Sequence, residues 1–232
     1  MDRPLDREAV AGVLRSTLLF GALDDDSLLS LAAVCRQRAY GKGQYLWYQG
    51  DPGTVLVIIC SGLVKVMLAS GHGDEVVLAM LGEHEAVGEL SVLDGLPRSA
   101  SIVAVQPTKV LLLDRSSVLE ILGRRPEVLA AVLRALGHLV RRMTEQTGDL
   151  VFLDLGGRLA KLLLRLGGPP DEAGPVMLDA GLSQSDLAAM IGATRPAVNR
   201  ALHTFVTRGL ITIDGPVIAL RDLPGLRRRA DD

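Results

Sequence analysis

The sequence contains only two cysteines, Cys35 and Cys60, and neither lies in a CxxC motif or a His–Cys cluster. Such isolated cysteines exclude a disulfide framework and favour buried, reduced thiols in a cytoplasmic protein. Long hydrophobic runs are also missing: stretches such as 55–60 and 110–113 are far shorter than the roughly 20 apolar residues of a membrane helix. The charged residues 1–4 lack the apolar core of a signal peptide, so we expect a cytoplasmic protein without membrane contact.

Neither sign of charge dominates the composition. The 232 residues carry a net charge of −2, with 48% hydrophobic and 22% charged residues, which excludes a disordered chain. Residues 1–154 hold 15 basic and 19 acidic side chains (net −4), and residues 155–232 hold 10 and 8 (net +2). A case for nucleic-acid binding therefore depends on where the arginines lie. The length suits one large or two modest domains.

Glycine-rich turns divide the first half of the chain. Residues 9–38 show helical spacing of apolar residues, and the acidic run 24–26 supplies N-cap residues. From Tyr40 on, turns such as 70–73 recur and separate short apolar runs. The expected strands are 55–60, 63–68, 75–80, 101–105 and 109–114. This pattern predicts an antiparallel sandwich or roll.

After Pro126, apolar residues are spaced alternately three and four apart. The series is Leu129, Val132, Leu136, Leu139, Met143, Leu150 and Leu153, with Gln146 as its polar member. This heptad pattern predicts a long helix over 127–153 that pairs with the same helix of a second copy. The alternative is an amphipathic helix that packs only on its own core.

Glycines then interrupt the helical pattern. Gly156-Gly157 predicts a hinge, and a further helix is expected over 158–166 with its stop at 167–170. Near the C-terminus, the arginines 227–229 are expected to be solvated and close to DNA phosphates.

Residues 182–202 have the pattern of a helix-turn-helix. Ser183 and Asp186 resemble a capping box, and Gly192 permits a tight turn. The second helix is expected to start near Thr194, and Pro196 is tolerated in its first turn. The strands 210–213 and 217–220, joined by the turn 214–216, would add the wing of a winged helix. We expect Arg195, Asn199 and Arg200 on the outer face of the second helix.

Those three side chains suit a DNA major groove. Arginine can donate two hydrogen bonds to guanine, and asparagine can pair in the same way with adenine. The alternative is a three-helix interaction module that never touches DNA.

The segment 88–101 indicates a ligand. Glu89 follows Gly88 and is itself followed, nine residues later, by Arg98 and then Ser99. A carboxylate can accept a hydrogen bond from a sugar hydroxyl. An arginine, a serine hydroxyl and amides at a short helix start can hold one phosphate. An ion pair between Glu89 and Arg98 with no ligand is the alternative.

Both motifs, in this order, resemble the cyclic-AMP receptor protein/FNR (CRP/FNR) family of bacterial transcription regulators over nearly the whole chain. Residues 152–160 are also similar to the hinge segment of that family. The resemblance implies an α+β fold in three parts. A double-stranded β-roll with N-terminal helices would bind a cyclic nucleotide over 1–125. A long dimerisation helix and hinge would cover 126–154, and a winged helix-turn-helix DNA-binding domain 155–232.

The resemblance also implies roles for matching residues. The residues implied to hold the nucleotide are Gly88, Glu89, Leu90, Arg98, Ser99, Ala100, Met143 and Thr144. Among these, Glu89 would accept from the ribose 2′-hydroxyl, and Arg98 and Ser99 would bind the cyclic phosphate. Met143 and Thr144 lie where the family's cyclic-AMP responders place polar residues against adenine. The residues implied to contact DNA are Ser183, Thr194, Arg195, Pro196, Asn199 and Arg200.

Two positions depart from the pattern of the family. Met143 cannot make the hydrogen bond that a threonine there gives to adenine, although Thr144 can still bond the base. Pro196 stands where the prototype has a glutamate that accepts from cytosine, so a relaxed or shifted half-site is expected.

The function implied is a dimeric regulator that binds pseudo-palindromic promoter DNA, responds allosterically to cAMP or a related cyclic nucleotide, and contacts RNA polymerase. A family member with another effector, or none, is the alternative. An iron–sulfur sensor would need a cysteine cluster, and the histidines at 72, 84, 138 and 203 are expected to be ordinary polar residues rather than haem ligands. No enzyme is expected, because the sequence has no Walker-type loop or kinase motif.

Overall fold

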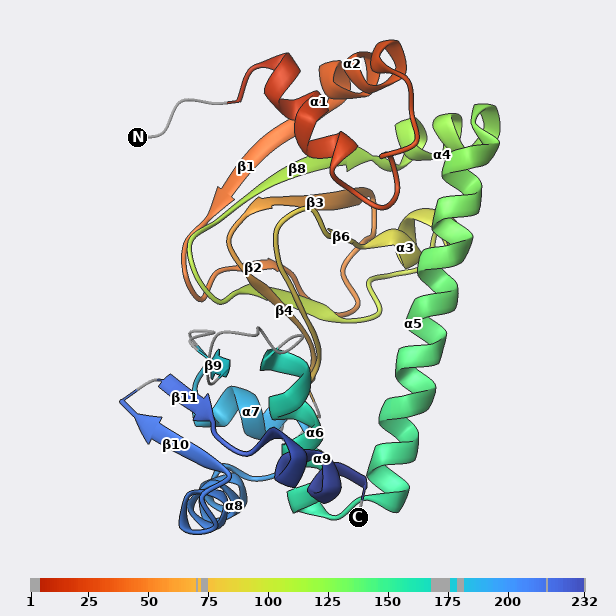
Figure 1. The fold of residues 1–232 in the computed structure, drawn as a ribbon. Coiled ribbons are helices and arrows are strands. Elements are labelled where there is room, and N and C mark those ends of the chain that lie inside the picture. The colour runs from red at the N-terminus through yellow and green to blue at the C-terminus, as the bar shows by residue number, and fades with distance from the viewer. Residues whose placement is uncertain are drawn as a thin grey trace. The chain divides into compact units, whose positions relative to one another are not determined.

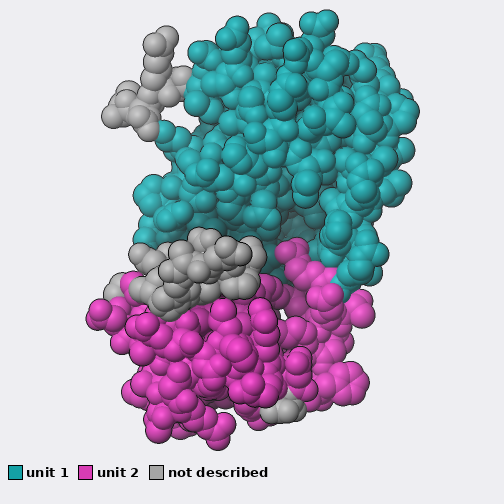
Figure 2. Space-filling model, viewed as in Figure 1, with its two compact units in different colours: residues 1–68, 78–141 teal, residues 69–77, 142–232 magenta. Residues whose placement is uncertain are grey.

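The computed structural model describes residues 5–69, 71, 75–167, 176–178, 182–215 and 217–231. Three expected features lie outside these residues, at least in part: the turn 70–73 with His72, the helix stop 168–170, and Pro216 in the wing turn. The chain divides into two compact units, the first made of residues 1–68 and 78–141 and the second of residues 69–77 and 142–232 (Figure 2).

Two helices precede the strands. α1 (Arg7–Arg15) and α2 (Asp25–Val34) each begin after an aspartate whose carboxylate accepts a backbone N–H, at Asp6 and Asp24. The predicted acidic cap of α2 is thus confirmed. The helical prediction over 9–38 is wrong at its end, because residues 36–40 form a strand.

Two four-stranded sheets lie between residues 36 and 114 (Figure 1). One has the order β1-β8-β3-β6 and the other β2-β7-β4-β5, and the described pairings of neighbouring strands are antiparallel. The strands are β1 (Arg36–Tyr40), β2 (Tyr45–Trp47), β3 (Val55–Ser61), β4 (Val64–Ala69), β5 (Glu75–Leu81), β6 (Ala86–Val87), β7 (Ser101–Ala104) and β8 (Thr108–Asp114). The five predicted strands and the antiparallel roll are confirmed, whereas β1, β2 and β6 were not predicted.

The central strand β3 is buried on both faces, which explains its unbroken apolar sequence. Leu56 and Ile58 pack with the helices of the first unit, in a cluster that includes Phe20. Val57 and Ile59 point the other way, into the cluster between the two sheets. Successive side chains of a strand alternate in direction, so a continuous apolar run serves two cores at once.

Three helices follow or interrupt the sheets: α3 (Glu89–Asp94), α4 (Arg115–Arg124) and α5 (Pro126–Phe152). The predicted long helix is confirmed, although Leu153 lies just beyond its end, and α4 was not predicted. The boundary between the two units falls within α5, between residues 141 and 142.

The second unit is a winged helix with one further helix. Its elements are α6 (Leu155–Gly167), β9 (Val176–Leu178), α7 (Gln184–Met190), α8 (Arg195–Thr207), β10 (Ile211–Asp214), β11 (Val217–Leu220) and α9 (Leu223–Asp231). The strands form an antiparallel sheet of order β10-β11-β9. Leu159 and Leu163 of α6 share a core with Val198 and Leu202 of α8. The helix-turn-helix and its wing are therefore confirmed, and β9 is an addition.

Candidate functional site

The segment 88–101 begins at a glycine in the left-handed region. Gly88 is the N-cap of α3 with φ of 91°, and Gly95 is the C-cap of α3 with φ of 75°. Residues with a Cβ rarely adopt this backbone conformation. At Gly88 the space is occupied as well, since an added Cβ would meet Arg98 Nη1 and would lie 3.2 Å from Trp47 Cη2. This turn therefore requires glycine both for its conformation and for the close approach of Arg98.

Arg98 is a buried cation with an open donor. Its side chain is in a residue only 4% exposed. Nη1 donates to the carbonyl of Gly88 at 3.2 Å, and Nη2 donates to that of Val55 at 2.7 Å. Nε is also buried, yet it donates to no atom of the described residues. Burial lowers the pKa of Arg98, and nearby carboxylates, Glu89 foremost, oppose that shift. An anion that accepted from Nε would both satisfy this donor and offset the burial of the charge.

The other predicted ligand residues lie around this guanidinium. Glu89 and Leu90 are half-buried, and Ser99 is exposed beside the buried Arg98. Ala100 is 7% exposed. The structure thus brings the Arg98 guanidinium to Gly88 at the start of α3, with Ser99 as the next residue of the chain.

Trp47 is the residue that sequence reasoning missed. Its ring centroid lies 3.9 Å from Arg98 Cζ, and its Nε1 donates to the carbonyl of Ala100 at 2.9 Å. The local sequence gives no signal for these contacts, because Trp47 precedes the segment by some forty residues and belongs to the unpredicted strand β2.

The two predicted adenine contacts lie on α5. Met143 is 43% exposed and Thr144 is exposed. Both belong to the second unit, whereas Glu89 and Arg98 belong to the first, so the geometry of the phosphate site given above does not include them.

The start of the helix-turn-helix has the predicted cap. Ser183 Oγ accepts from the backbone N–H of Asp186, and the carboxylate of Asp186 accepts from the backbone N–H of Ser183. Gly192 provides the turn with φ of 61°. Thr194 is the N-cap of α8, where its hydroxyl accepts from the N–H of Ala197. These local signals were readable in the sequence because each cap lies within three residues of its partner.

Of the three side chains predicted on the outer face of α8, only the two arginines are exposed to solvent. Arg195, Pro196 and Arg200 are exposed. Asn199 is half-buried, and its amide nitrogen donates to Gln184 Oε1 at 2.9 Å. The structure thus presents the two arginines to solvent and ties the asparagine to α7.

Comparisons with known proteins match both halves of the chain. A cyclic nucleotide-binding domain model matches residues 37–125, and a Crp-like helix-turn-helix domain model matches residues 157–229. The CRP-like cAMP-activated global transcriptional regulator of Mycobacterium tuberculosis is 31% identical over 220 residues, which cover 94% of this chain and 98% of that protein. This chain belongs to the CRP/FNR family.

Other members of the CRP/FNR family agree. The cyclic AMP receptor protein of Thermus thermophilus is 31% identical over 90% of this chain and 94% of that protein. Among solved structures, the Thermus thermophilus catabolite activator protein has 30% identity and a TM-score of 0.54, covering 93% of this chain and 99% of that one. The c-di-GMP responsive regulator CLP of Xanthomonas campestris shares the fold, with a TM-score of 0.76 at 22% identity over 86% of this chain and 100% of that one. Like its family, the chain is a transcription regulator with a cyclic nucleotide-binding domain, and not an enzyme.

The exposed face of α5 differs from the predicted seam. Val132 and its neighbour Val128 are buried in the helical core of the first unit. The exposed apolar residues of the helix are Leu129, Leu133, Val140, Met143, Leu150, Val151 and Phe152. The face that reaches solvent therefore includes positions 133 and 140 in place of 132 and 139. The predicted seam is wrong at Val132, which packs inside its own chain, and positions 139 and 146 are half-buried.

The glycine pair that predicted a hinge lies inside the first turn of α6. Asp154 Oδ1 accepts from the N–H of Gly157 at 2.8 Å and so caps this helix. Asp154 also pairs with Arg229 of α9 through both carboxylate oxygens. A Cβ on Gly156 would collide with the guanidinium of Arg229. Arg229 is only 20% exposed in its side chain, so the expectation that arginines 227–229 are all solvated is wrong for this one.

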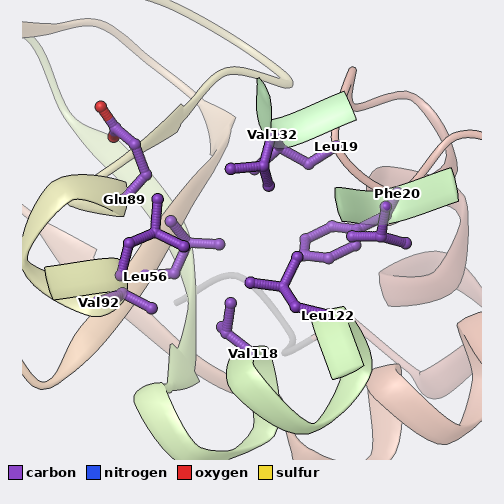
Figure 3. A pocket seen from close by; sticks show the side chains of 10 residues that line it. Leu19, Phe20, Leu56, Glu89, Val92, Val118, Leu122 and Val132 are labelled. Atoms are coloured by element: carbon purple, nitrogen blue, oxygen red, sulfur yellow. The ribbon is translucent and has the colours of Figure 1, made fainter. Parts of the chain in front are cut away.

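A small apolar pocket lies behind α3 in the first unit (Figure 3). Val92, Val118, Val132 and Phe20 are among its lining residues. Glu89 also contributes to the wall, but its carboxylate points away from the pocket (Figure 3). The pocket is thus a gap in the packing between helices and not the anion site.

Other expected features have simple outcomes. Cys35 and Cys60 are free and half-buried, and burial raises the pKa of their thiols to about 12 and about 11. The two thiols were expected to be buried and are half-buried instead. Among the described residues, no three His, Cys, Asp or Glu side chains form a group that could hold a metal ion. None of the helices in the described ranges is long and apolar enough to cross a membrane.

Proposed function

We propose that this protein is a dimeric transcription regulator whose binding to pseudo-palindromic promoter DNA is controlled allosterically by a cyclic nucleotide, cAMP foremost. The observation that carries the proposal is the buried guanidinium of Arg98, whose Nε has no acceptor in the described part of the chain and which is followed in the sequence by the exposed Ser99. The two relatives at 31% identity are a cAMP-activated regulator and a cyclic AMP receptor protein by name. In this proposal residues 1–125 bind the nucleotide, residues 126–154 form the dimerisation helix and hinge, and residues 155–232 bind DNA.

In the proposed complex, a phosphate oxygen accepts from Arg98 Nε, and Ser99 adds its hydroxyl with the amide of Ala100. Glu89 accepts from the ribose 2′-hydroxyl, in a turn shaped by Gly88 and Leu90. Thr144 bonds the adenine edge, while Met143 offers it only an apolar contact. Cyclic AMP would fit these groups, with an affinity that the apolar Met143 reduces.

We infer that the second copy covers the exposed face of α5. Leu129, Leu133, Val140, Met143 and Leu150 recur with the alternating spacing of a coiled-coil seam. The hydroxyl of Thr147, which falls in the same series, donates to the carbonyl of Met143 at 2.9 Å and so is satisfied within the helix. Large exposed apolar side chains in this arrangement mark a protein–protein interface.

The two α8 helices of such a dimer would enter successive major grooves about 34 Å apart. Arg195 and Arg200 would read guanines, and Thr194 and Ser183 would approach phosphates. Pro196 offers only an apolar contact, and Asn199 would have to leave Gln184 to reach a base. The regulator would also contact RNA polymerase at the promoter.

Titration calorimetry with cAMP, cGMP and cyclic di-GMP, followed by DNA-binding anisotropy with and without the nucleotide that binds, tests this proposal. We expect cAMP to bind, to tighten specific DNA binding, and to bind far more weakly to Arg98→Gln. Arg195→Ala should remove sequence preference, while Arg208→Ala, at the exposed C-terminal cap of the same helix, should keep it. No response of DNA affinity to any of the three nucleotides would instead indicate another effector or a constitutive regulator.

A further inference from the structure

Trp47 lies under the phosphate side of the proposed site and contacts three of its members. The Arg98 guanidinium stacks on its ring, with Cζ 3.9 Å from the centroid. Its indole N–H donates to the carbonyl of Ala100 at 2.9 Å. A Cβ on Gly88 would lie 3.2 Å from its Cη2, so the tryptophan also sets how closely the turn can approach.

The backbone around Trp47 holds the same segment. In the β2–β7 pairing, Trp47 stands opposite Ile102. Beyond β2, the N–H of Gly50 donates to the carbonyl of Arg98, and the N–H of Arg98 donates to the carbonyl of Asp51, both at 2.9 Å. Arg98 is therefore fixed along its main chain by the turn that follows Trp47 and along its side chain by the ring itself.

An aromatic ring suits a cation that has to bind an anion. A carboxylate in the same place would accept the guanidinium donors and neutralise the charge before a phosphate arrived. The face of an indole attracts the cation through its quadrupole and takes up no N–H. Nη1 and Nη2 are held by the carbonyls of Gly88 and Val55, whereas the buried Nε has no acceptor among the described residues.

We propose that Trp47 is a positioning residue of the nucleotide site, which holds the Arg98 guanidinium and the carbonyl of Ala100 so that Arg98 Nε meets the phosphate. This inference rests on the proposed function above, since it concerns the same site.

Calorimetric titration of Trp47→Leu and Trp47→Phe with cAMP tests the role of the ring. Trp47→Leu should weaken cAMP binding about 5- to 30-fold, the range expected for loss of a desolvated cation–π contact. Trp47→Phe should restore most of the affinity, because it keeps a ring under Arg98 and loses only the indole N–H. The matched control is Tyr48→Leu, an exposed neighbouring aromatic that stacks on Tyr45 instead, and it should stay within about twofold of wild type. Circular dichroism and urea unfolding verify that each variant is folded.

Repeating Trp47→Leu in an Arg98→Gln background separates positioning from general support of the fold. If the ring acts through Arg98, the second substitution should weaken cAMP binding by less than about twofold more. A full additional loss in that background, or wild-type affinity in Trp47→Leu alone, would overturn the inference while leaving the proposed function intact. A wild-type protein that binds no cyclic nucleotide would overturn both. Trp47 is the only tryptophan of the chain, so its fluorescence should also change when cAMP binds the wild type, and an unchanged spectrum at saturation would contradict the contact.

Discussion

Gly88→Ala should disturb the phosphate site more than an alanine substitution at any other glycine of this segment. The new Cβ would have to occupy a backbone conformation with φ of 91°. It would also meet Arg98 Nη1 and lie 3.2 Å from both the ring of Trp47 and the carbonyl oxygen of Val55. Since the ring and the backbone are fixed by the sheets, the guanidinium is the group that moves.

The expected loss of stability has two parts. The left-handed conformation costs an L-residue about 1–2 kcal/mol. Displacement of Arg98 from the carbonyl of Gly88 breaks a hydrogen bond to a charged group, which is worth about 1.5–3 kcal/mol when buried. Alanine also restricts the unfolded chain, an opposing effect of about 0.4–1 kcal/mol. Gly88→Ala should therefore lower the free energy of unfolding of the first unit by about 2–4 kcal/mol.

Gly95→Ala is the matched control, at the opposite end of α3. Gly95 also has a positive φ, of 75°, but its Cβ would only reach 3.4 Å from Arg115 Nη2. It shares the conformational cost without the collision, so the difference between the two variants isolates the displacement of Arg98. Urea unfolding followed by the fluorescence of Trp47 reports on the first unit. Equal losses in the two variants would refute the idea that Gly88 exists to admit Arg98, as would undiminished cAMP affinity in Gly88→Ala.

Three further outcomes follow from the contacts described. Val140→Asp, on the exposed face of α5, should convert the dimer to monomer in sedimentation analysis, whereas His138→Asp, exposed on another face, should not; a dimeric Val140→Asp would exclude the proposed seam. The hydrogen bond from Arg229 holds the pKa of Asp154 below its usual value, so this carboxylate stabilises the fold above about pH 4, and that stability is lost as the pH falls through the lowered pKa. Arg229→Ala should reduce this acid dependence of unfolding, and an unchanged pH profile would show that the pair contributes nothing. Ser183→Ala should cost the second unit about 1 kcal/mol by removal of its helix cap, measured by urea unfolding, and no loss would mean that the cap is dispensable.

Sequence patterns predicted the inner strands of both sheets and the edge strand β5, but they missed the other three edge strands, β1, β2 and β6. The run 55–60 is apolar throughout because β3 lies between two cores, so its identification needed no alternation. β1 (Arg36–Tyr40) is an edge strand in the order β1-β8-β3-β6, and only Tyr40 at its end is buried. A strand with only one buried residue lacks the alternation of apolar and polar residues that predicts a strand. Its first residues were therefore included in the predicted helical segment 9–38.

The register of α5 shows a different limit. Positions 132 and 133 are both apolar, as are 139 and 140, so two heptad series fit the sequence equally well. The choice is made by what the helix packs against in its own chain. Val132 enters the helical core beside Val128, and this leaves Leu133 for the outer face. Spacing alone identifies the helix and its length, but tertiary packing assigns its faces.

In the candidate site, too, local features could be predicted from the sequence, whereas contacts made by tertiary packing could not. The turn glycine, the N-caps and the Arg–Ser pair were all predictable, because each depends on residues within a few positions. Trp47 under Arg98 and Gln184 beside Asn199 were not, since strand pairing and helix packing bring them together. Side chains that support a ligand-binding group from another element leave no local trace in a sequence.

The Gly156-Gly157 pair then bears on where the proposed allosteric movement can occur. Gly156 admits the guanidinium of Arg229, and Asp154 is bound to that arginine, so the start of α6 is joined to α9 rather than loosened. The end of α5 and α6 are joined by the ion pair of Asp149 with Lys161, at 2.6 Å, and Arg165 of α6 also interacts with Asp149 and Glu145. A rotation of α6 against α5 would have to break these polar contacts. It would carry Asp154, Arg229 and α9 along as one piece, so that the pivot would lie before Asp154 and the glycines would travel with the DNA-binding unit.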